Sequence, residues 1–467
     1  MPNEVPTPEG CRSAPRVSFF TLGCRLNQHD TAAMRSDLER AGWRADDSGE
    51  GSPDVVIVNS CTVTRRADQE SRQLIRKLAR ERPGARIVVT GCYAQRAPEE
   101  VRGLPGVALV LGTAERESIA SIDALRAVAA GREGAAVEVA PGRARRAVTE
   151  ASPLHFGRAR ALLKIQDGCD TFCGYCIVPY VRGRSRSLPR EAVLEQARRL
   201  LAAGFRELVL TGADLGDYRD GHKRTGERGD LASLVEALLS LPAQGTPHRI
   251  RLSSIEPNKV DDSLLDLLAT EPRLCRHLHL PLQSGSATML RAMRRAYEPS
   301  DYARLVERAA ASGPIAIGAD VIVGFPGEGP REFAETLDFL RAIPVSFLHV
   351  FRYSERPGTR AATLDARPPA AVARERAALL RRLGDAKREA FARSLVGSVR
   401  GVVMEARRGK EGAWLGTSDL YTTVAMTRRP AHPGPFQVRI EGRDGDVLRG
   451  TPVGEPPARP EEAVSER

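Results

Sequence analysis

Short β-prone runs alternate with longer stretches of helical periodicity along most of this 467-residue chain, and no other feature constrains its fold as strongly. Chains that alternate in this way fold into α/β domains with parallel sheets. The first block predicts strands at 17–22, 54–58, 87–90 and 107–111, and helices such as 31–41 and 67–81. We therefore expect an N-terminal open α/β domain over residues 15–130.

A second block of alternation begins at Ala161 and continues to Tyr353. Its strands are predicted at 161–166, 207–212, 249–255, 277–282, 315–323 and 345–353, and its helices include 189–203, 230–240, 300–312 and 330–342. Six βα units predict a partial (β/α)6 barrel over residues 159–370, with functional groups at the carboxyl ends of the strands. The preceding residues, 131–158, show little periodicity and are rich in Gly, Pro and Arg, so we expect a linker there.

The C-terminal part of the chain has a different pattern. An Arg-rich helix is expected over residues 371–396, followed at 397–454 by short strands broken by Gly, Asp and Pro. That pattern predicts a small β-barrel. Residues 455–467 are expected to be disordered.

Three cysteines follow the first strand of the second block with the spacing CxxxCxxC: Cys169, Cys173 and Cys176. A structural zinc ion takes four protein ligands, whereas three thiolates on a 4Fe-4S cluster leave one iron open to another ligand. Free cysteine is often a small buried hydrophobe, but a polar loop containing glycine is not a core position. The spacing predicts such a cluster, with zinc as the alternative.

Three further cysteines each come directly after a predicted strand of the first block: Cys24, Cys61 and Cys92. Ligands of open α/β sheets bind at the carboxyl ends of the strands, so these thiols are expected to converge. They predict a second three-thiolate cluster, the alternative being three unrelated buried thiols. Cys11 and Cys275 fit neither set, and the eight histidines show no ligand spacing in the sequence.

The net charge of +11 favours a polyanionic partner such as nucleic acid, although a solvated Arg-rich surface is the alternative. Arg182, Arg184 and Arg186, just beyond the cysteine loop, are candidates for phosphate contacts. No run reaches the ~20 apolar residues of a membrane span. The first residues lack the pattern of a secretory signal, so a cytoplasmic protein without disulfides is expected.

Several motifs together resemble those of the radical S-adenosylmethionine (SAM) methylthiotransferases, over about residues 15–453. They are Thr21-Leu-Gly-Cys-Arg-Leu-Asn-Gln, Asn59-Ser-Cys-Thr-Val-Thr, Thr90-Gly-Cys-Tyr-Ala-Gln, the 169/173/176 loop and Asp320-Val-Ile-Val-Gly-Phe-Pro-Gly-Glu. The C-terminal β-barrel is similar to the TRAM RNA-binding module. Within the family, Arg251-Leu-Ser-Ser-Ile-Glu-Pro and the Cys61 and Cys92 motifs look most like the threonylcarbamoyladenosine branch. Asp170-Thr171 replaces an Asn pair and Ser60 a Thr, and neither change removes a ligand.

The resemblance implies two 4Fe-4S clusters and SAM as cofactors. SAM would bind the open iron at the 169/173/176 loop and yield a 5′-deoxyadenosyl radical, while the cluster at Cys24, Cys61 and Cys92 would handle sulfur. The reaction would insert a methylthio group at carbon 2 of N6-threonylcarbamoyladenosine beside the tRNA anticodon. By the same resemblance, five residues are expected near SAM: Gly212, Asp214, Gly324, Gly327 and Glu328.

The partners implied are tRNA, an electron donor of the reductase or flavodoxin type and a sulfur source, and we expect a monomer. Two alternatives stay within the family, namely action on isopentenyladenosine in tRNA or on an aspartate of a ribosomal protein. A third belongs to another class, a non-catalytic metal-bearing RNA-binding protein. About eight iron atoms per chain together with SAM cleavage would exclude that third alternative.

Overall fold

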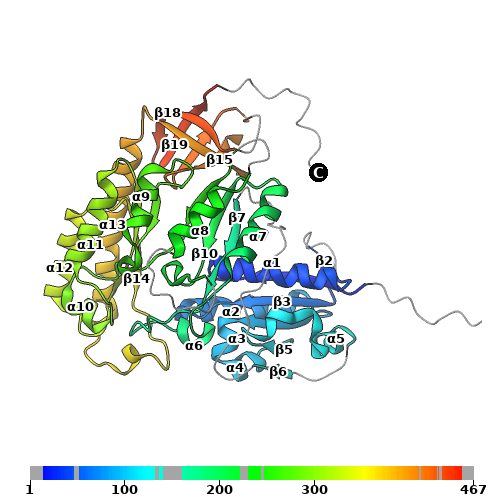
Figure 1. Ribbon diagram of the computed structural model, residues 1–467. Coiled ribbons are helices and arrows are strands. Elements are labelled where there is room, and N and C mark those ends of the chain that lie inside the picture. Colours follow the sequence, from blue (N-terminus) through cyan, green and yellow to red (C-terminus); the bar gives the residue numbers. More distant parts are fainter. Residues whose placement is uncertain are drawn as a thin grey trace, which may run out of the picture. The chain divides into compact units, whose positions relative to one another are not determined.

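The structure is a computed structural model that describes residues 14–46, 52–131, 136–139, 160–220, 230–242, 247–409, 412–428, 430 and 434–454. The chain divides into two compact units, residues 1–152 and 153–467. Figure 1 shows the elements of the first unit in blue and cyan, and those of the second in colours from green to red. Cys11, most of the predicted linker and the tail at 455–467 lie outside the described residues.

The first unit contains a parallel sheet of six strands in the order β2-β1-β3-β4-β5-β6. The strands are β1 (Arg16–Thr21), β2 (Arg44–Ala45), β3 (Val55–Ser60), β4 (Arg86–Gly91), β5 (Val107–Leu111) and β6 (Ala136–Glu138). The four strands predicted from the sequence are confirmed, and β2 and β6 extend the sheet at its edges. For β6 the linker prediction was wrong, because these residues pair with β5 and Val137 packs on the core.

Helices cover both faces of this sheet. They are α1 (Arg25–Arg40), α2 (Arg65–Glu81), α3 (Cys92–Arg96), α4 (Pro98–Arg102), the 3-10 helix η1 (Glu115–Ser121) and α5 (Asp123–Ala129). Ile57 of β3 belongs to the same core cluster as Leu38 of α1, whereas its neighbour Val58 packs in a second cluster with Ile75 of α2. A strand buried on both faces therefore reads as a continuous apolar run in the sequence.

The second unit begins with six parallel strands that keep their order along the chain. One sheet contains β7 (Arg160–Lys164), β10 (Glu207–Thr211) and β11 (Arg249–Leu252), and another contains β12 (His277–His279), β13 (Ala316–Val323) and β14 (Phe347–Arg352). Parallel bridges from Ile250 to Leu274 and from Ser254 to His279 join the two sheets. The strands thus form the predicted partial barrel.

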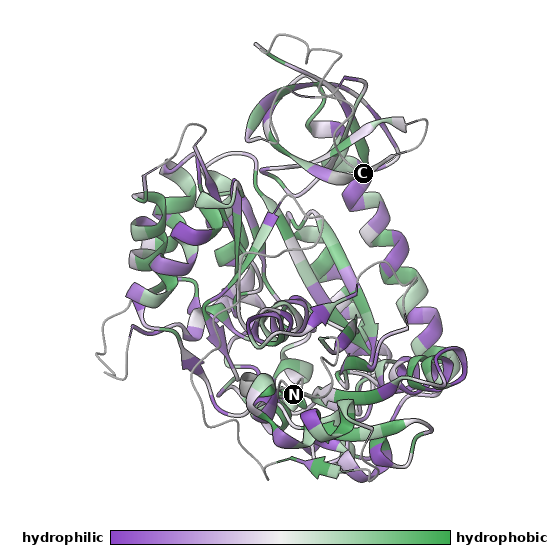
Figure 2. Cartoon of the chain, turned by 90° about the vertical axis from the view of Figure 1, so that its right-hand side faces the viewer, coloured by the Kyte–Doolittle hydropathy of each residue, from purple (hydrophilic) through white to green (hydrophobic). Residues whose placement is uncertain are grey.

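The helices of this partial barrel are α6 (Val178–Arg182), α7 (Arg190–Ala202), α8 (Asp230–Leu239), α9 (Asp262–Thr270), α10 (Ala287–Ala292), α11 (Pro299–Ala311) and α12 (Pro330–Ala342). Two short strands, β8 (Gln166–Asp167) and β9 (Arg186–Ser187), flank the cysteine loop. Figure 2 shows hydrophobic residues concentrated along strands and mixed hydrophilic and hydrophobic residues along helices. This distribution is expected where amphipathic helices cover a sheet.

A long helix leads to the C-terminal β-barrel. Helix α13 (Ala370–Ser394) packs on β14, where a Cβ on Gly384 would lie 3.1 Å from Leu348 Cβ. The closed barrel follows in the order β15 (Val399–Arg408), β16 (Trp414–Ser418), β17 (Thr423–Met426), β19 (Val447–Pro452) and β18 (Phe436–Asp444). Its core cluster includes Leu395 and, from the partial barrel, Ala316. The C-terminal barrel therefore shares a core with the partial barrel.

Buried charges also join these two barrels. Glu207, at the start of β10, is fully buried and accepts hydrogen bonds from Arg249 Nε at 2.6 Å and Arg251 Nε at 2.7 Å. The two guanidinium groups also donate, over 2.7–3.1 Å, to four backbone carbonyl oxygens of the C-terminal barrel, those of Gly401, Thr417, Ser418 and Asp419. One buried carboxylate thus compensates two cations that hold the second barrel.

Candidate functional site

The three-cysteine loop has a single course because its backbone is fixed on both sides. Gly168 has a φ of +73°, and a Cβ there would lie 2.0 Å from the carbonyl oxygen of Arg184, so only glycine fits. Within the loop, the Gly174 amide donates to Met293 O at 2.8 Å, and Gly174 O accepts from the Ala361 amide at 2.7 Å. Segments far apart in the sequence therefore hold the loop at the carboxyl end of β7.

Polar hydrogens point at two of the three sulfur atoms. The Thr171 amide donates to Cys169 Sγ at 3.5 Å, and Arg295 Nη1 donates to Cys173 Sγ at 3.3 Å. Burial raises the pKa of the Cys169 thiol to about 11 and raises that of Cys176 as well. Metal coordination reverses this effect, because it deprotonates thiols. Since hydrogen bonds to sulfur also tune thiolate-bound iron, the loop fits an iron-sulfur cluster.

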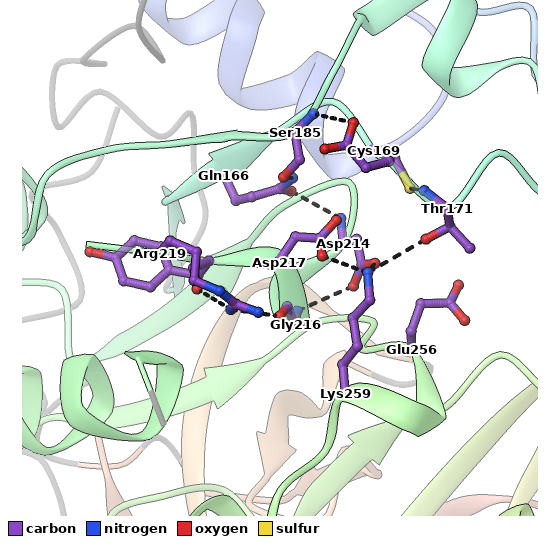
Figure 3. A network of polar contacts seen from close by, with 12 residues as sticks. Gln166, Cys169, Thr171, Ser185, Asp214, Gly216, Asp217, Arg219, Glu256 and Lys259 are labelled. Atoms are coloured by element: carbon purple, nitrogen blue, oxygen red, sulfur yellow. Dashed lines mark hydrogen bonds and ion pairs between the residues drawn. The ribbon is translucent and has the colours of Figure 1, made fainter. Parts of the chain in front are cut away.

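A lysine between two carboxylates lies beside Cys169 (Figure 3). Lys259 Nζ is 2.5 Å from Asp214 Oδ2 and 2.6 Å from Asp217 Oδ1, and it reaches Thr171 Oγ1 at 3.5 Å. Cys169 Sγ and carboxylate oxygens of both aspartates lie within 4.8 Å of one another. Burial alone would lower the pKa of Lys259, but the two carboxylates outweigh it and raise that pKa. The structure therefore brings Asp214, predicted near SAM, to the first cysteine of the loop.

Gly212 lies just before this lysine network, at the carboxyl end of β10. A Cβ on Gly212 would lie 2.8 Å from Gln166 Oε1, which accepts a hydrogen bond from the Asp214 amide at 3.0 Å. Gln166 Nε2 in turn donates to the Gly168 carbonyl at 2.8 Å. Gly212 thus lets Gln166 connect the end of β10 to the cysteine loop.

A second ion pair lies beside the middle cysteine, Cys173, and no motif in the sequence indicated it. Arg295 Nη1 donates to Glu256 Oε1 at 2.9 Å, and Nη2 pairs with the other carboxylate oxygen. Arg295 Nη2 also donates to the carbonyl oxygen of Pro281 at 2.9 Å. Because Arg295 also donates to Cys173, this pair places a buried guanidinium group directly against the sulfur atom of Cys173.

The turn after β13 contains the other predicted SAM residues. Gly324 and Gly327 have φ values of +74° and +85°, a backbone conformation that favours glycine. A Glu328 side-chain oxygen accepts from the Gly324 amide at 3.1 Å and is ion-paired with Arg376 of α13. The carboxylate of Glu328 therefore holds the turn, and the two glycines shape it.

The first unit places its three cysteines at the carboxyl edge of its sheet: Cys24 before α1, Cys61 after β3 and Cys92 at the start of α3. A Cβ on Gly23, which has a φ of +97°, would lie 2.8 Å from Cys61 Sγ. A Cβ on Gly91 would lie 2.4 Å from the Ser60 carbonyl oxygen. The loops that carry the cysteines are therefore in contact, as the strand positions predicted.

Two asparagines within the cysteine motifs, Asn27 and Asn59, connect these loops by hydrogen bonds. Asn27 Nδ2 donates to the carbonyl oxygens of Leu22 at 2.7 Å and Ser60 at 3.1 Å. Asn59 Nδ2 donates to Asn27 O at 2.9 Å. Asn27 lies three residues after Cys24, and Asn59 lies two residues before Cys61. This closeness to the cysteines was the sequence signal that could have identified them. Both side chains act as positioning groups for the cysteine loops.

The prediction of a phosphate contact was wrong for Arg182. This side chain is buried, and its Nη1 donates to both carboxylate oxygens of Asp167 at 3.0 and 3.1 Å. Arg186 also approaches Asp167, at 3.5 Å. Arg184 differs, because its side chain is 63% exposed and lies over the ring of Phe172. Of the three arginines, only Arg184 presents most of its side chain to solvent.

Two of the eight histidines meet at one carboxylate in the structure. His279 and His349 both lie beside Asp320, although no spacing in the sequence indicated it. The three residues come from three neighbouring strands, and strand pairing rather than sequence distance brings them together.

Among the described residues, no helix is both long and apolar enough to cross a membrane.

Comparison with protein families gives two matches. Residues 16–112 match a family described as uncharacterized, UPF0004, and residues 163–340 match the radical SAM superfamily. The two matches fall on the two cysteine-bearing domains.

Two curated proteins are similar over most of their length, and both are named threonylcarbamoyladenosine tRNA methylthiotransferase MtaB. The Bacillus subtilis protein is 38% identical over 88% of this chain and 90% of its own length. The Aquifex aeolicus protein is 38% identical over 84% of this chain and 94% of its own length.

Among solved structures, the radical SAM methyltransferase TsrM from Kitasatospora setae, with tryptophan and a SAM analogue bound, matches with a TM-score of 0.54. The match covers 85% of this chain and 79% of the TsrM chain, at 17% sequence identity. At that identity the likeness concerns the fold.

Proposed function

This chain belongs to the family of radical SAM threonylcarbamoyladenosine tRNA methylthiotransferases, and on that premise we propose that it inserts a methylthio group at carbon 2 of N6-threonylcarbamoyladenosine beside the anticodon of tRNA. One observation carries the proposal: a fixed loop with three thiols at the carboxyl end of a partial barrel, in a chain 38% identical to relatives of that name. Membership of the radical SAM superfamily brings an iron-sulfur cluster and SAM with it.

We assign this cluster to the loop of Cys169, Cys173 and Cys176. When bound, cluster and SAM supply one-electron chemistry, which side chains alone do not provide for an unactivated C–H bond. The chain's own contribution is to fix the three thiols and to aim the Thr171 amide and the Arg295 guanidinium at their sulfur atoms. These donors stabilise thiolates and set the potential at which the cluster is reduced.

Residues around the loop would receive SAM. Asp214 lies beside Cys169 and offers a carboxylate to the ammonium group of SAM, while Asp217 retains Lys259. Gly212 allows the close approach of Gln166 that positions this edge. At the end of β13, the backbone around Gly324 and Gly327 would pack against the adenine, with Glu328 holding the turn through Arg376.

A second cluster would be held in the first unit by Cys24, Cys61 and Cys92. The contacts of Gly23 with Cys61 and of Gly91 with Ser60 support this assignment, because they bring the three loops together. Thiolate ligation is the usual way such clusters are held. This cluster would handle the sulfur to be inserted, so the enzyme also needs a sulfur source and an electron donor.

The exposed guanidinium of Arg184 is suited to a tRNA phosphate.

The test is nucleoside mass spectrometry of total tRNA from a strain that lacks the gene. The strain is complemented with the wild-type chain, with Cys173→Ala, or with Cys275→Ala. Cys275 is a buried thiol outside both cysteine sets, so it serves as a matched control. We expect methylthiolated threonylcarbamoyladenosine to return with the wild type and Cys275→Ala, but not with Cys173→Ala.

Other outcomes would refute the assignment in different ways. Accumulation of unmethylthiolated isopentenyladenosine would move the substrate to another branch of the family. Unchanged tRNA in the deletion strain would reject tRNA as the substrate and direct the search to a ribosomal protein. Full rescue by Cys173→Ala would reject the assignment of the loop.

A further inference from the structure

Three side chains from neighbouring strands meet on one face of the partial barrel: His279 of β12, Asp320 of β13 and His349 of β14. The register pairs His279 with Gly318 and Asp320 with His349. Because side chains two residues apart share a face of a strand, Gly318 and Asp320 lie on the same face. The neighbouring residue Leu348 packs on Gly384 of helix α13, so His349 points away from that contact. The three strands that carry this group contain none of the cysteines of either set.

The three polar atoms lie at distances typical of ligands around one metal ion. His279 Nε2 is 3.0 Å and His349 Nδ1 is 3.2 Å from the same oxygen, Asp320 Oδ1, and the ligand atoms lie within 4.8 Å of one another. Zinc binds nitrogen and oxygen at about 2.0–2.1 Å, which places neighbouring ligands of a tetrahedron about 3.3 Å apart. Small side-chain movements would therefore suffice to close the three ligands around a cation.

The two imidazole rings are held in place by packing. Their centroids are 5.1 Å apart with an interplanar angle of 30°, and the ring of Phe347 lies 5.6 Å from that of His349. A Cβ on Gly318 would lie 2.2 Å from the ring of Phe347 and 2.9 Å from His279 Nδ1. Glycine at position 318 therefore leaves the room that the rings of His279 and Phe347 occupy.

The group is also accessible from outside. The side chains of His279 and Asp320 are 11% and 24% exposed, whereas that of His349 is 47% exposed. His349 lines a cavity of about 220 Å³, together with Phe347, Arg388 and Tyr421. The inner two ligands are thus shielded from bulk water, and the outer one gives an ion a path of entry, as a metal site requires.

We propose that His279, Asp320 and His349 form a binding site for a divalent metal ion such as zinc or ferrous iron. Two imidazoles and one carboxylate are a donor set of sites that keep a coordination position open. That position would hold water or an anionic oxygen ligand entering from the cavity. The alternative is a metal-free group in which both rings donate hydrogen bonds to the carboxylate. The proposal is independent of the tRNA substrate.

The test uses zinc as the probe on the full-length protein with its clusters reconstituted anaerobically. One equivalent of Zn²⁺ is added, unbound metal is removed by dialysis, and bound zinc is counted by mass spectrometry. X-ray absorption at the zinc edge then identifies the ligands, since sulfur lies at about 2.3 Å and nitrogen or oxygen at about 2.0–2.1 Å. This second readout separates the proposed site from zinc held by cysteines.

The variants are His349→Ala, Asp320→Asn and the control Asp338→Asn. Asp338 lies on α12 with a side chain that is 72% exposed, so the control removes the same charge away from the group. We expect one zinc ion per wild-type chain, bound by nitrogen and oxygen only. Loss of a supporting residue outside the ligand set costs 10–100-fold in affinity, so loss of a ligand should cost at least about 100-fold. The control should bind zinc as the wild type does.

Three results would overturn the proposal: no retained zinc, zinc bound by sulfur, or equal affinity in His349→Ala and the wild type. Asp320 is more buried than His349, so its replacement has the larger effect on folding. The half-exposed His349 is replaced at lower cost, and iron content and circular dichroism equal to the wild type show that the fold is retained. The zinc affinity of His349→Ala therefore tests the proposed site even if Asp320→Asn does not fold.

Discussion

Replacement of Glu207 by glutamine tests the junction between the partial barrel and the C-terminal barrel. In the wild type, this fully buried carboxylate compensates the guanidinium groups of Arg249 and Arg251 through hydrogen bonds of 2.6 and 2.7 Å. Glutamine keeps the size of the side chain but removes its charge. Breaking a buried ion pair by removing one partner costs about 3–5 kcal/mol, because the other charge stays buried without compensation.

This cost predicts a large increase in opening at the junction. At 1.4 kcal/mol for each factor of ten, about 3–5 kcal/mol raises the opening equilibrium by about two to three and a half orders of magnitude. Hydrogen-deuterium exchange measures this opening through backbone amides, such as that of Asp419, which donates to Gly401 O at 2.9 Å. We expect faster exchange in peptides from β15 and β16 and unchanged exchange in β3 and β4 of the first unit.

The matched control is Glu195→Gln. Glu195 lies on α7, has a side chain that is 48% exposed and pairs with Arg198 and Arg199. Exposed pairs contribute about 0–1 kcal/mol, so this variant should exchange nearly as the wild type does. If Glu207→Gln and Glu195→Gln gave the same protection of β15 and β16, the charge at Glu207 would not hold the junction.

The pH dependence gives the same test another form. Burial alone would raise the pKa of Glu207, but the guanidinium groups of Arg249 and Arg251 outweigh it and hold that pKa well below its usual range. A lowered pKa contributes stability that is present above the unfolded pKa, about 4.3 for Glu, and is lost as the pH falls towards the folded value. The difference between wild type and Glu207→Gln should therefore be constant from pH 7 to 5 and shrink below about pH 4.

Three other predictions concern the cysteine sites. Cys61→Ala should lower the iron content from about eight to about four atoms per chain and leave SAM cleavage in place; unchanged iron would reject the second cluster. Arg295→Lys removes the planar fork that reaches Cys173 and should shift the SAM cluster to a more negative reduction potential at equal iron content, measured by redox titration with electron paramagnetic resonance. Gly91→Ala should lower the free energy of unfolding by at least about 2 kcal/mol in urea titration, because φ is +95° and the new Cβ would lie 2.4 Å from a carbonyl oxygen; Gly84→Ala, with open space around it, is the control, and equal losses would contradict the reasoning.

Much of the fold was predictable because the strands are parallel and buried. The residues of β3 and β4 form nearly continuous apolar runs, since helices cover both of their faces. The short edge strands β2 and β6 were not predicted, because two or three residues at a sheet edge need no such run. The sheet edge that carries Cys24, Cys61 and Cys92 could be predicted because each lies just beyond the end of a strand, and the end of a strand is visible in the sequence.

The rest of the site depends on contacts that the sequence does not order. The residues around Arg182 have the composition of an exposed basic loop. The guanidinium group of Arg182 is nevertheless buried, because it is paired with the buried carboxylate of Asp167. His279 and His349 are 70 residues apart, and only the pairing of β12, β13 and β14 brings them to one carboxylate. Interactions between neighbouring strands leave no mark in local spacing, so they require the structure.

The way Arg249 and Arg251 hold the C-terminal barrel has an evolutionary consequence. Their acceptors in that barrel are main-chain carbonyl oxygens, which every amino acid provides. Attachment therefore places little restriction on which residues occupy positions 401 and 417–419, as long as the backbone keeps its path. The barrel can therefore accumulate substitutions on its outer surface and stay attached to the partial barrel. A chimera that carries the barrel of a distant relative should accordingly assemble with this arginine pair intact.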